Sequence, residues 1–254
     1  MYIDSHAHLS CETLADLVDS FAKRAKDANV AAIINICTDK KSFEKGLEIA
    51  NKYPWVYNTA ATPPHTIEEE GEKFFPLFKE AAKNKQIVAL GEFGLDYYYE
   101  HSPKEIQKKF LVKYFHLAQE YNLPVVIHCR NAFDDFFEIL DQEYKGQGVL
   151  HCFTGTLEEA KKVIDRGWYL SLSGIVTFKK SLDLQEVAKY VPLEQLLIET
   201  DSPYLAPQSK RGKQNEPSYI VEIAHFVANL KKLDSNLFNH QMKNNLKALF
   251  NLPI

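Results

Sequence analysis

The chain has 254 residues, of which 45% are apolar and 25% are charged, and its formal net charge is −4. A length near 250 residues suits one large domain or two small ones, and the composition is that of an ordinary globular protein with ample material for a core. The negative balance and a pI of about 6.2 argue against a basic protein that coats nucleic acid through a global positive field.

Short apolar runs of strand type alternate with amphipathic segments along the whole chain. The runs are rich in Val, Ile and Leu without strict polar alternation, which is typical of parallel strands that are covered on both faces. In chain order the predicted strands are 2–3, 31–37, 56–61, 87–91, 124–128, 148–152, 169–172 and 196–199.

The segments between these strands repeat apolar residues at helical spacing. The first of them carries Leu14, Leu17, Val18, Phe21 and Ala25. The sequence Ser-Pro-Lys-Glu at 102–105 predicts a capping box with proline in the first turn, and Thr156 with Glu159 predicts another. Two final helices are predicted over 216–231 and 235–250.

Eight strand–helix units follow one another, and no stretch between them has the composition of a linker. This count and spacing predict a single (β/α)8 barrel, an α/β fold of the TIM-barrel type, over residues 1–254. A doubly wound open sheet is the structural alternative, because the third and seventh strands are weakly patterned.

The four cysteines are far apart and form no C-x-x-C pair, which argues against a disulfide scaffold. Cys129 and Cys152 are predicted to be small apolar fillers on the opposite face of their strands from the neighbouring histidines. No signal sequence and no apolar run of membrane-spanning length is present, so we expect a cytoplasmic protein without a membrane partner.

Ionisable side chains stand at the ends of five of the predicted strands. In chain order they are His6 and His8, Glu92, His128, His151, and Glu199 with Asp201. The strands of a parallel barrel all open at the same carboxyl-terminal face, so these side chains are predicted to converge there. One residue separates His6 from His8, and side chains at positions i and i+2 point to the same face of a strand.

Each of these residues alone has a plain structural explanation, such as a helix cap at Glu92 or a turn at Asp201. Together they have no such explanation, because burying at least six ionisable groups at one rim is unfavourable unless something pairs them. Divalent cations would do so, and a mixed imidazole–carboxylate set suits Zn, Mn or a related metal.

The number of candidate ligands further predicts two ions, because a single tetrahedral zinc needs only three protein ligands and a water. A pair of ions needs a bridging carboxylate, for which Glu92 is placed halfway round the barrel. We predict that one ion is held by His6, His8 and Asp201, and the other by His128 and His151, with Glu92 shared.

Six stretches of sequence point to a known family. They are DSHAHL at 4–9, GEFGLDYYY at 91–99, PVVIHCR at 124–130, HCFTG at 151–155, ETDSPYLAP at 199–207 and RGKQNEPSY at 211–219. With them the chain resembles the TatD family of metal-dependent deoxyribonucleases, within the amidohydrolase superfamily. The resemblance implies a TIM-barrel phosphodiesterase that acts on DNA with divalent ions (Zn, Mn or Mg). It also implies the metal ligands His6, His8, Glu92, His128, His151 and Asp201.

One position departs from the family pattern. The family usually has Gly-x-His-Pro after the third strand, whereas this chain has proline at position 63, in the histidine's place. Because the family's histidine lies near the substrate, Pro63 bears on substrate choice or rate and leaves the ligand set unchanged. His65 either compensates from its different position or is an ordinary surface histidine.

The predicted chemistry is hydrolysis by an activated water. Asp201 is the residue expected to accept or orient the proton of that water, and Glu92 is the second predicted catalytic residue. Asp96 is a candidate partner for a ligand histidine.

Substrate contacts are predicted next to the ligands. Arg130 is predicted to bind a substrate phosphate, with a structural ion pair as the alternative. Tyr97 and its neighbours Tyr98 and Tyr99 are candidates to stack on a base, with at least one of the three packed in the core. The basic loop 210–213 is a candidate to follow a nucleic-acid backbone.

The sequence is compatible with three functions. The leading prediction is a DNA phosphodiesterase, and the second keeps the same site for another ester or amide bond, such as an aminoacyl-tRNA ester. The third is a barrel that binds metal or nucleic acid without turnover. No stable protein partner is predicted.

Overall fold

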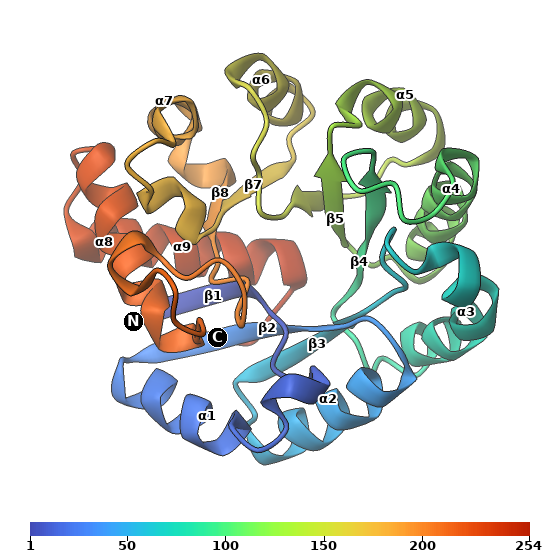
Figure 1. The fold of residues 1–254 in the computed structure, drawn as a ribbon, viewed down its shortest axis with the longest axis horizontal. Helices are drawn as coiled ribbons and strands as arrows, with labels where there is room; N and C mark the ends of the chain where they lie inside the picture. Colours follow the sequence, from blue (N-terminus) through green and yellow to red (C-terminus); the bar gives the residue numbers. More distant parts are fainter.

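The computed structural model describes all 254 residues, and they form the (β/α)8 barrel that the sequence predicts (Figure 1). Eight parallel strands make one sheet in the order of the chain. They are β1 (Tyr2–Ala7), β2 (Val30–Cys37), β3 (Val56–Ala60), β4 (Ala89–Asp96), β5 (Val125–Arg130), β6 (Gly148–Leu150), β7 (Tyr169–Leu172) and β8 (Leu196–Ile198). Because the strand order never reverses, the alternative of a doubly wound sheet is wrong.

Helices follow the strands and surround the barrel (Figure 1). They are α1 (Val18–Asp27), α2 (Lys40–Lys52), α3 (Ile67–Lys83), α4 (Lys104–Tyr121), α5 (Phe133–Glu143), α6 (Leu157–Asp165), α7 (Leu182–Tyr190), α8 (Ile220–Leu230) and α9 (Ser235–Phe250). The helix predicted over 216–231 begins as a short 3-10 turn, Pro217–Tyr219, before α8. None of the helices combines the length and the apolar character that a membrane crossing requires.

One of the two predicted capping boxes forms. The Thr156 hydroxyl accepts the backbone N–H of Glu159, and the Glu159 carboxylate accepts the N–H of Thr156. The box predicted at Ser102 is wrong, because Pro103 takes the cap position and α4 begins after it. The Ser102 hydroxyl instead donates to His65 O at 3.4 Å, so it ties this loop to the start of α3.

The barrel closes between β1 and the segment that follows β8. No ladder joins the two strands, but Ala7 and Ser202 form an isolated parallel bridge. The N–H of Asp201 donates to His6 O at 2.9 Å, and the N–H of His8 donates to Ser202 O at 2.7 Å. The closure of the barrel therefore places Asp201 beside His6 of β1 and His8, which directly follows it.

The β4–β5 pair is unusually close at its carboxyl end. Gly94 has a φ of 149°, and a Cβ atom added there would lie 1.9 Å from His128 O. Only glycine permits this approach. It keeps the side chains of β4 within reach of His128, and β4 continues five residues beyond the predicted end at Gly91, to Asp96.

Candidate metal centre

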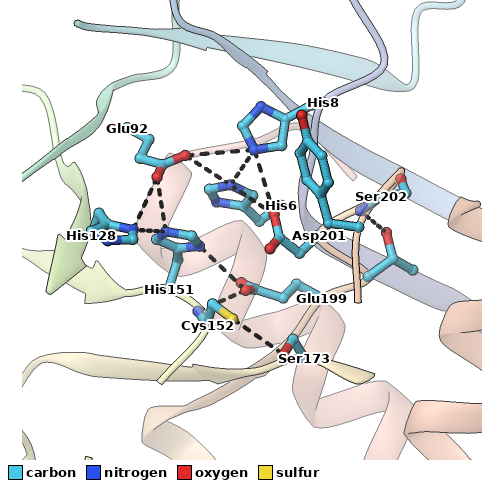
Figure 2. Close-up of polar contacts among 12 residues, drawn as sticks. His6, His8, Glu92, His128, His151, Cys152, Ser173, Glu199, Asp201 and Ser202 are labelled. Carbon is cyan, nitrogen blue, oxygen red and sulfur yellow. Dashed lines mark hydrogen bonds and ion pairs between the residues drawn. The ribbon is translucent and has the colours of Figure 1, made fainter. Parts of the chain in front are cut away.

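The side chains predicted at the strand ends meet in one place, and Figure 2 shows them pointing toward one another. They come from widely separated parts of the chain. They are His6 in β1, His8 directly after β1, Glu92 in β4, His128 in β5, His151 directly after β6 and Asp201 after β8. The predicted convergence of these six side chains is therefore present.

The Glu92 carboxylate contacts four histidines, and its two oxygens face different histidine pairs (Figure 2). Its Oε2 atom is 3.4 Å from His6 Nε2 and 3.5 Å from His8 Nε2. Its Oε1 atom is 3.2 Å from His128 Nδ1 and 3.2 Å from His151 Nε2. The carboxylate thus has the position that a bridge between two ligand sets requires.

Asp201 completes the set that contains the two histidines of the first strand. Its Oδ1 atom is 3.4 Å from His8 Nε2 and 3.6 Å from His6 Nε2. In the other set, His151 Nε2 and His128 Nδ1 are 3.4 Å apart. The rings of His6 and His151 stack with centroids 3.9 Å apart, so the two sets lie in direct contact.

The cluster carries no lysine or arginine, and histidines alone pair with its carboxylates. Burial would raise the pKa of Glu92, but His151, His128 and His6 beside it hold that pKa well below its ordinary value. Burial would lower the pKa of His151, but Glu92 and Glu199 raise it well above the usual range. The site is thus a dense set of mutually dependent charges.

The spacing and chemistry of the donor atoms test whether the cluster fits a metal ion. Ligand atoms of His6, His8 and Glu92 lie within 4.8 Å of one another, as do those of Glu92, His128 and His151. Imidazole nitrogens with carboxylate oxygens are the ligands of Zn and Mn, so the donor set fits a divalent cation.

Two buried acidic residues support the cluster. Glu199 was predicted to lie at this face but not as a site residue, and Asp4 was not predicted there. Glu199 accepts the N–H of Cys152 at 2.6 Å, and its Oε1 atom is 3.4 Å from His151 Nδ1. Asp4 accepts the N–H and the hydroxyl of Thr200 at 2.9 and 2.6 Å, and burial raises the pKa of Asp4 to about 8. Each stands two residues before a candidate ligand, and this spacing was the available signal.

A cavity of about 680 Å³ opens over the cluster and is lined by Glu92, His128 and Asp201, among others. Arg130 also lines it, and the Arg130 side chain forms no hydrogen bond or ion pair within the protein. The structural ion pair considered as the alternative for this residue is therefore absent. Its donors are free to meet an anion in the cavity.

Asp96 and His65 form the wall behind His128. Asp96 Oδ2 is 2.9 Å from His128 Nε2 and 3.2 Å from His65 Nε2, so the partner predicted for a candidate ligand histidine is confirmed. His65 lines the cavity and is not an ordinary surface histidine. Pro63 lines it as well, so the departure from the family pattern lies in the wall of this cavity.

Several predicted neighbours of the site lie elsewhere or differ in role. Tyr97 does not line the cavity, because its hydroxyl donates to Asp135 Oδ2 on α5 at 2.6 Å, so the structure does not support the predicted substrate contact. Tyr99 lines the cavity instead. The basic loop 210–213 does not reach the cavity wall.

The two cysteines next to candidate ligands both contribute to the lining of the cavity. Cys129 also packs against the hydrophobic core, as an apolar filler would, whereas the strand position expected for Cys152 is wrong. Cys152 follows the end of β6 with a φ of 42°, and strand alternation no longer applies there.

Asn215 fixes the segment that carries Asp201. Its side-chain amide is fully buried and donates to Thr200 O at 2.7 Å and to Tyr204 O at 2.6 Å. Its backbone N–H donates to Pro203 O at 3.1 Å. Asn215 therefore holds both sides of the turn around Asp201.

Replacing Asn215 with Ala should lower the free energy of unfolding by about 2–4 kcal/mol, because two buried carbonyl groups lose their donor. It should also weaken metal binding, because the backbone around Asp201 is no longer held. Urea denaturation of the chelated protein and titration calorimetry with Mn²⁺ measure the two effects. The exposed Asn244→Ala variant on α9 is the matched control. A change below about 0.5 kcal/mol in the Asn215 variant would contradict the prediction.

Comparison with known proteins agrees with this geometry. The family model described as TatD related DNase matches residues 3–251. An uncharacterised metal-dependent hydrolase, YabD of Bacillus subtilis (strain 168), is 37% identical over 99% of this chain and 100% of its own length. The 3'-5' ssDNA/RNA exonuclease TatD of Escherichia fergusonii is 32% identical over 98% of both chains.

Among solved structures, the crystal structure of YjjV, a TatD homologue from Escherichia coli K12, superposes with a TM-score of 0.93. It is 26% identical, and the match covers 99% of this chain and 98% of that chain. The relatives, the fold and the imidazole–carboxylate cluster all indicate hydrolysis that depends on a divalent metal. The chain therefore belongs to the TatD family of metal-dependent hydrolases.

Proposed function

We propose that this protein is a phosphodiesterase that hydrolyses DNA with two divalent cations, which are Zn, Mn or Mg. The division of the two Glu92 oxygens between separate histidine pairs supports the number of cations. Arg130 is the observation that favours a phosphodiester as the cleaved bond. Its guanidinium lies unpaired in the wall of the cavity, and its planar set of N–H donors matches the oxygens of a phosphate. The relative named as an ssDNA/RNA exonuclease supports the same choice.

The cations would be held by His6, His8 and Asp201 on one side and by His128 and His151 on the other, with Glu92 shared. Divalent cations bound there supply a water that loses its proton near neutral pH and a positive charge beside the phosphate oxygens.

Asp201 accepts or orients the proton of the attacking water. It lines the cavity, and although burial acts in the other direction, His8 and His6 keep the pKa of Asp201 below its ordinary value. Its carboxylate is therefore ionised at neutral pH and able to accept a hydrogen bond. Arg130 donates to a non-bridging oxygen of the phosphate, and Asp96 holds the ring of His128 in one orientation.

A substrate panel tests the proposal. We expect the purified protein, after chelation and resupply of Mg²⁺, Mn²⁺ or Zn²⁺, to cleave end-labelled DNA, and we expect chelator alone to abolish cleavage. RNA and p-nitrophenyl carboxylic esters are tested in parallel, because the same site in this fold can serve other bonds. Cleavage of the carboxylic ester without cleavage of any phosphodiester would overturn the proposed substrate and favour an ester such as aminoacyl-tRNA.

A further inference from the structure

The loop after β4 forms an aromatic wall beside the candidate metal centre. Tyr99 lines the cavity and is 53% exposed. Its ring is parallel to that of His101, with centroids 5.3 Å apart and an interplanar angle of 5°. Tyrosine carries a large apolar surface that is usually covered, and here more than half of it faces solvent at the entrance to a polar site.

The wall is fixed to the metal centre through one carboxylate. Asp96 Oδ1 accepts the backbone N–H of Tyr98 at 3.0 Å and of Tyr99 at 2.8 Å. Its other oxygen, Oδ2, is the one that receives His128 Nε2. The same buried side chain thus sets the orientation of His128 and the backbone of Tyr99, so the distance between the aromatic wall and the metal centre cannot vary freely.

A cationic group accompanies the aromatic rings. The guanidinium carbon of Arg130 lies 3.8 Å from the centroid of the Tyr98 ring and 4.8 Å from that of Tyr99. This stacking orients the guanidinium plane without using its N–H donors, which have no acceptor in the protein. An aromatic face next to free guanidinium donors is complementary to a base next to a phosphate.

We propose that Tyr99, whose ring rests against the parallel ring of His101, stacks on one nucleobase that neighbours the scissile phosphate, and that Arg130 binds the phosphate of that nucleotide. This inference rests on the proposed phosphodiesterase function and adds the residues that recognise the nucleotide. Stacking on Tyr99 requires a base whose face is uncovered, so the subsite takes an unpaired nucleotide and tolerates any of the four bases.

An abasic scan of the substrate tests the subsite. In single-stranded oligonucleotides, a tetrahydrofuran abasic residue is placed in turn at each nucleotide around the cleaved bond. For the wild-type protein, we expect one position at which loss of the base lowers kcat/KM by about tenfold or more. Tyr99→Ala should lose a similar factor on the intact oligonucleotide and less than about twofold further on the substrate that is abasic at that position.

Matched variants separate stacking from other effects. Tyr99→Trp should retain the wild-type rate, because stacking needs a ring and not the hydroxyl. Tyr190→Ala on α7 removes another exposed tyrosine that does not line the cavity, and it should leave all rates unchanged. A Tyr99→Ala variant that matches the wild type on the intact oligonucleotide would overturn the subsite, as would an equal further loss at every abasic position.

A binding measurement distinguishes failure of the subsite from failure of the proposed function. Fluorescence anisotropy of a labelled single-stranded oligonucleotide is measured with the chelated protein, so no cleavage occurs. Tyr99→Ala should raise the Kd about tenfold, and the Tyr190→Ala variant should not. If the wild type cleaves no nucleic acid with any metal, the phosphodiesterase fails, while an unchanged Kd in Tyr99→Ala overturns the subsite itself.

Discussion

Replacing Glu92 with Gln should lower metal-dependent hydrolysis by about 10³-fold or more and remove most of the bound metal, because effects of this size follow the loss of a central catalytic group. Each Glu92 oxygen faces a different histidine pair, at 3.4 and 3.5 Å on one side and at 3.2 Å to two ring nitrogens on the other. Gln keeps the shape but has one oxygen and no charge. One of the two sets then faces an amide NH₂, which cannot coordinate a cation.

The prediction is checked by steady-state kinetics on the substrate that the panel identifies and by the metal content of the purified variant. The matched control is Glu158→Gln, a change of the same chemistry on an exposed residue of α6. Circular dichroism confirms that both variants are folded. If neither the Glu92 variant nor a chelator changes the measured hydrolysis, that hydrolysis does not take place at this cluster and comes from a contaminating enzyme.

The convergence of the six polar side chains was predictable because a barrel turns distant strand ends into neighbours. His6 and His8 illustrate this, since spacing by two along a strand fixes their common direction, and their Nε2 atoms are 3.2 Å apart. The place of Glu92 between two histidine pairs was predictable from its strand number alone. The same spacing applies to Asp4 and Glu199, which stand two residues before the candidate ligands His6 and Asp201 and are fully buried.

What the sequence did not reveal depends on backbone irregularity and on long-range contacts. Cys152 lies beyond its strand in a left-handed conformation, so alternation predicts its direction wrongly. Tyr97, Tyr98 and Tyr99 are consecutive, and of the three only Tyr99 lines the cavity. Tyr97 is turned away by its contact with Asp135 on α5, which the sequence does not show. Asn215 acts through backbone carbonyl groups 11 and 15 residues earlier in the same connection between β8 and α8, and no local pattern indicates such a role.

Asp201→Asn should separate metal binding from turnover, which Glu92→Gln cannot do. Asp201 has a φ of 55°, a left-handed conformation that asparagine adopts more readily than most residues. The hydrogen bond from the N–H of residue 201 to His6 O and the bridge between Ala7 and Ser202 should therefore be retained. Asn also keeps an oxygen near His8 Nε2 as a ligand. Asn lacks the carboxylate that would accept a proton from water.

We therefore expect Asp201→Asn to lower kcat by about 10²–10⁴-fold, the range associated with loss of a general base, while part of the metal stays bound. Titration calorimetry with Mn²⁺ and kinetics on the same preparation give the two values. The ratio of activity to bound metal is the decisive quantity: it should fall steeply in this variant. If kcat falls only in proportion to the bound metal, Asp201 is a ligand without a role in proton transfer, and full activity would remove it from the mechanism altogether.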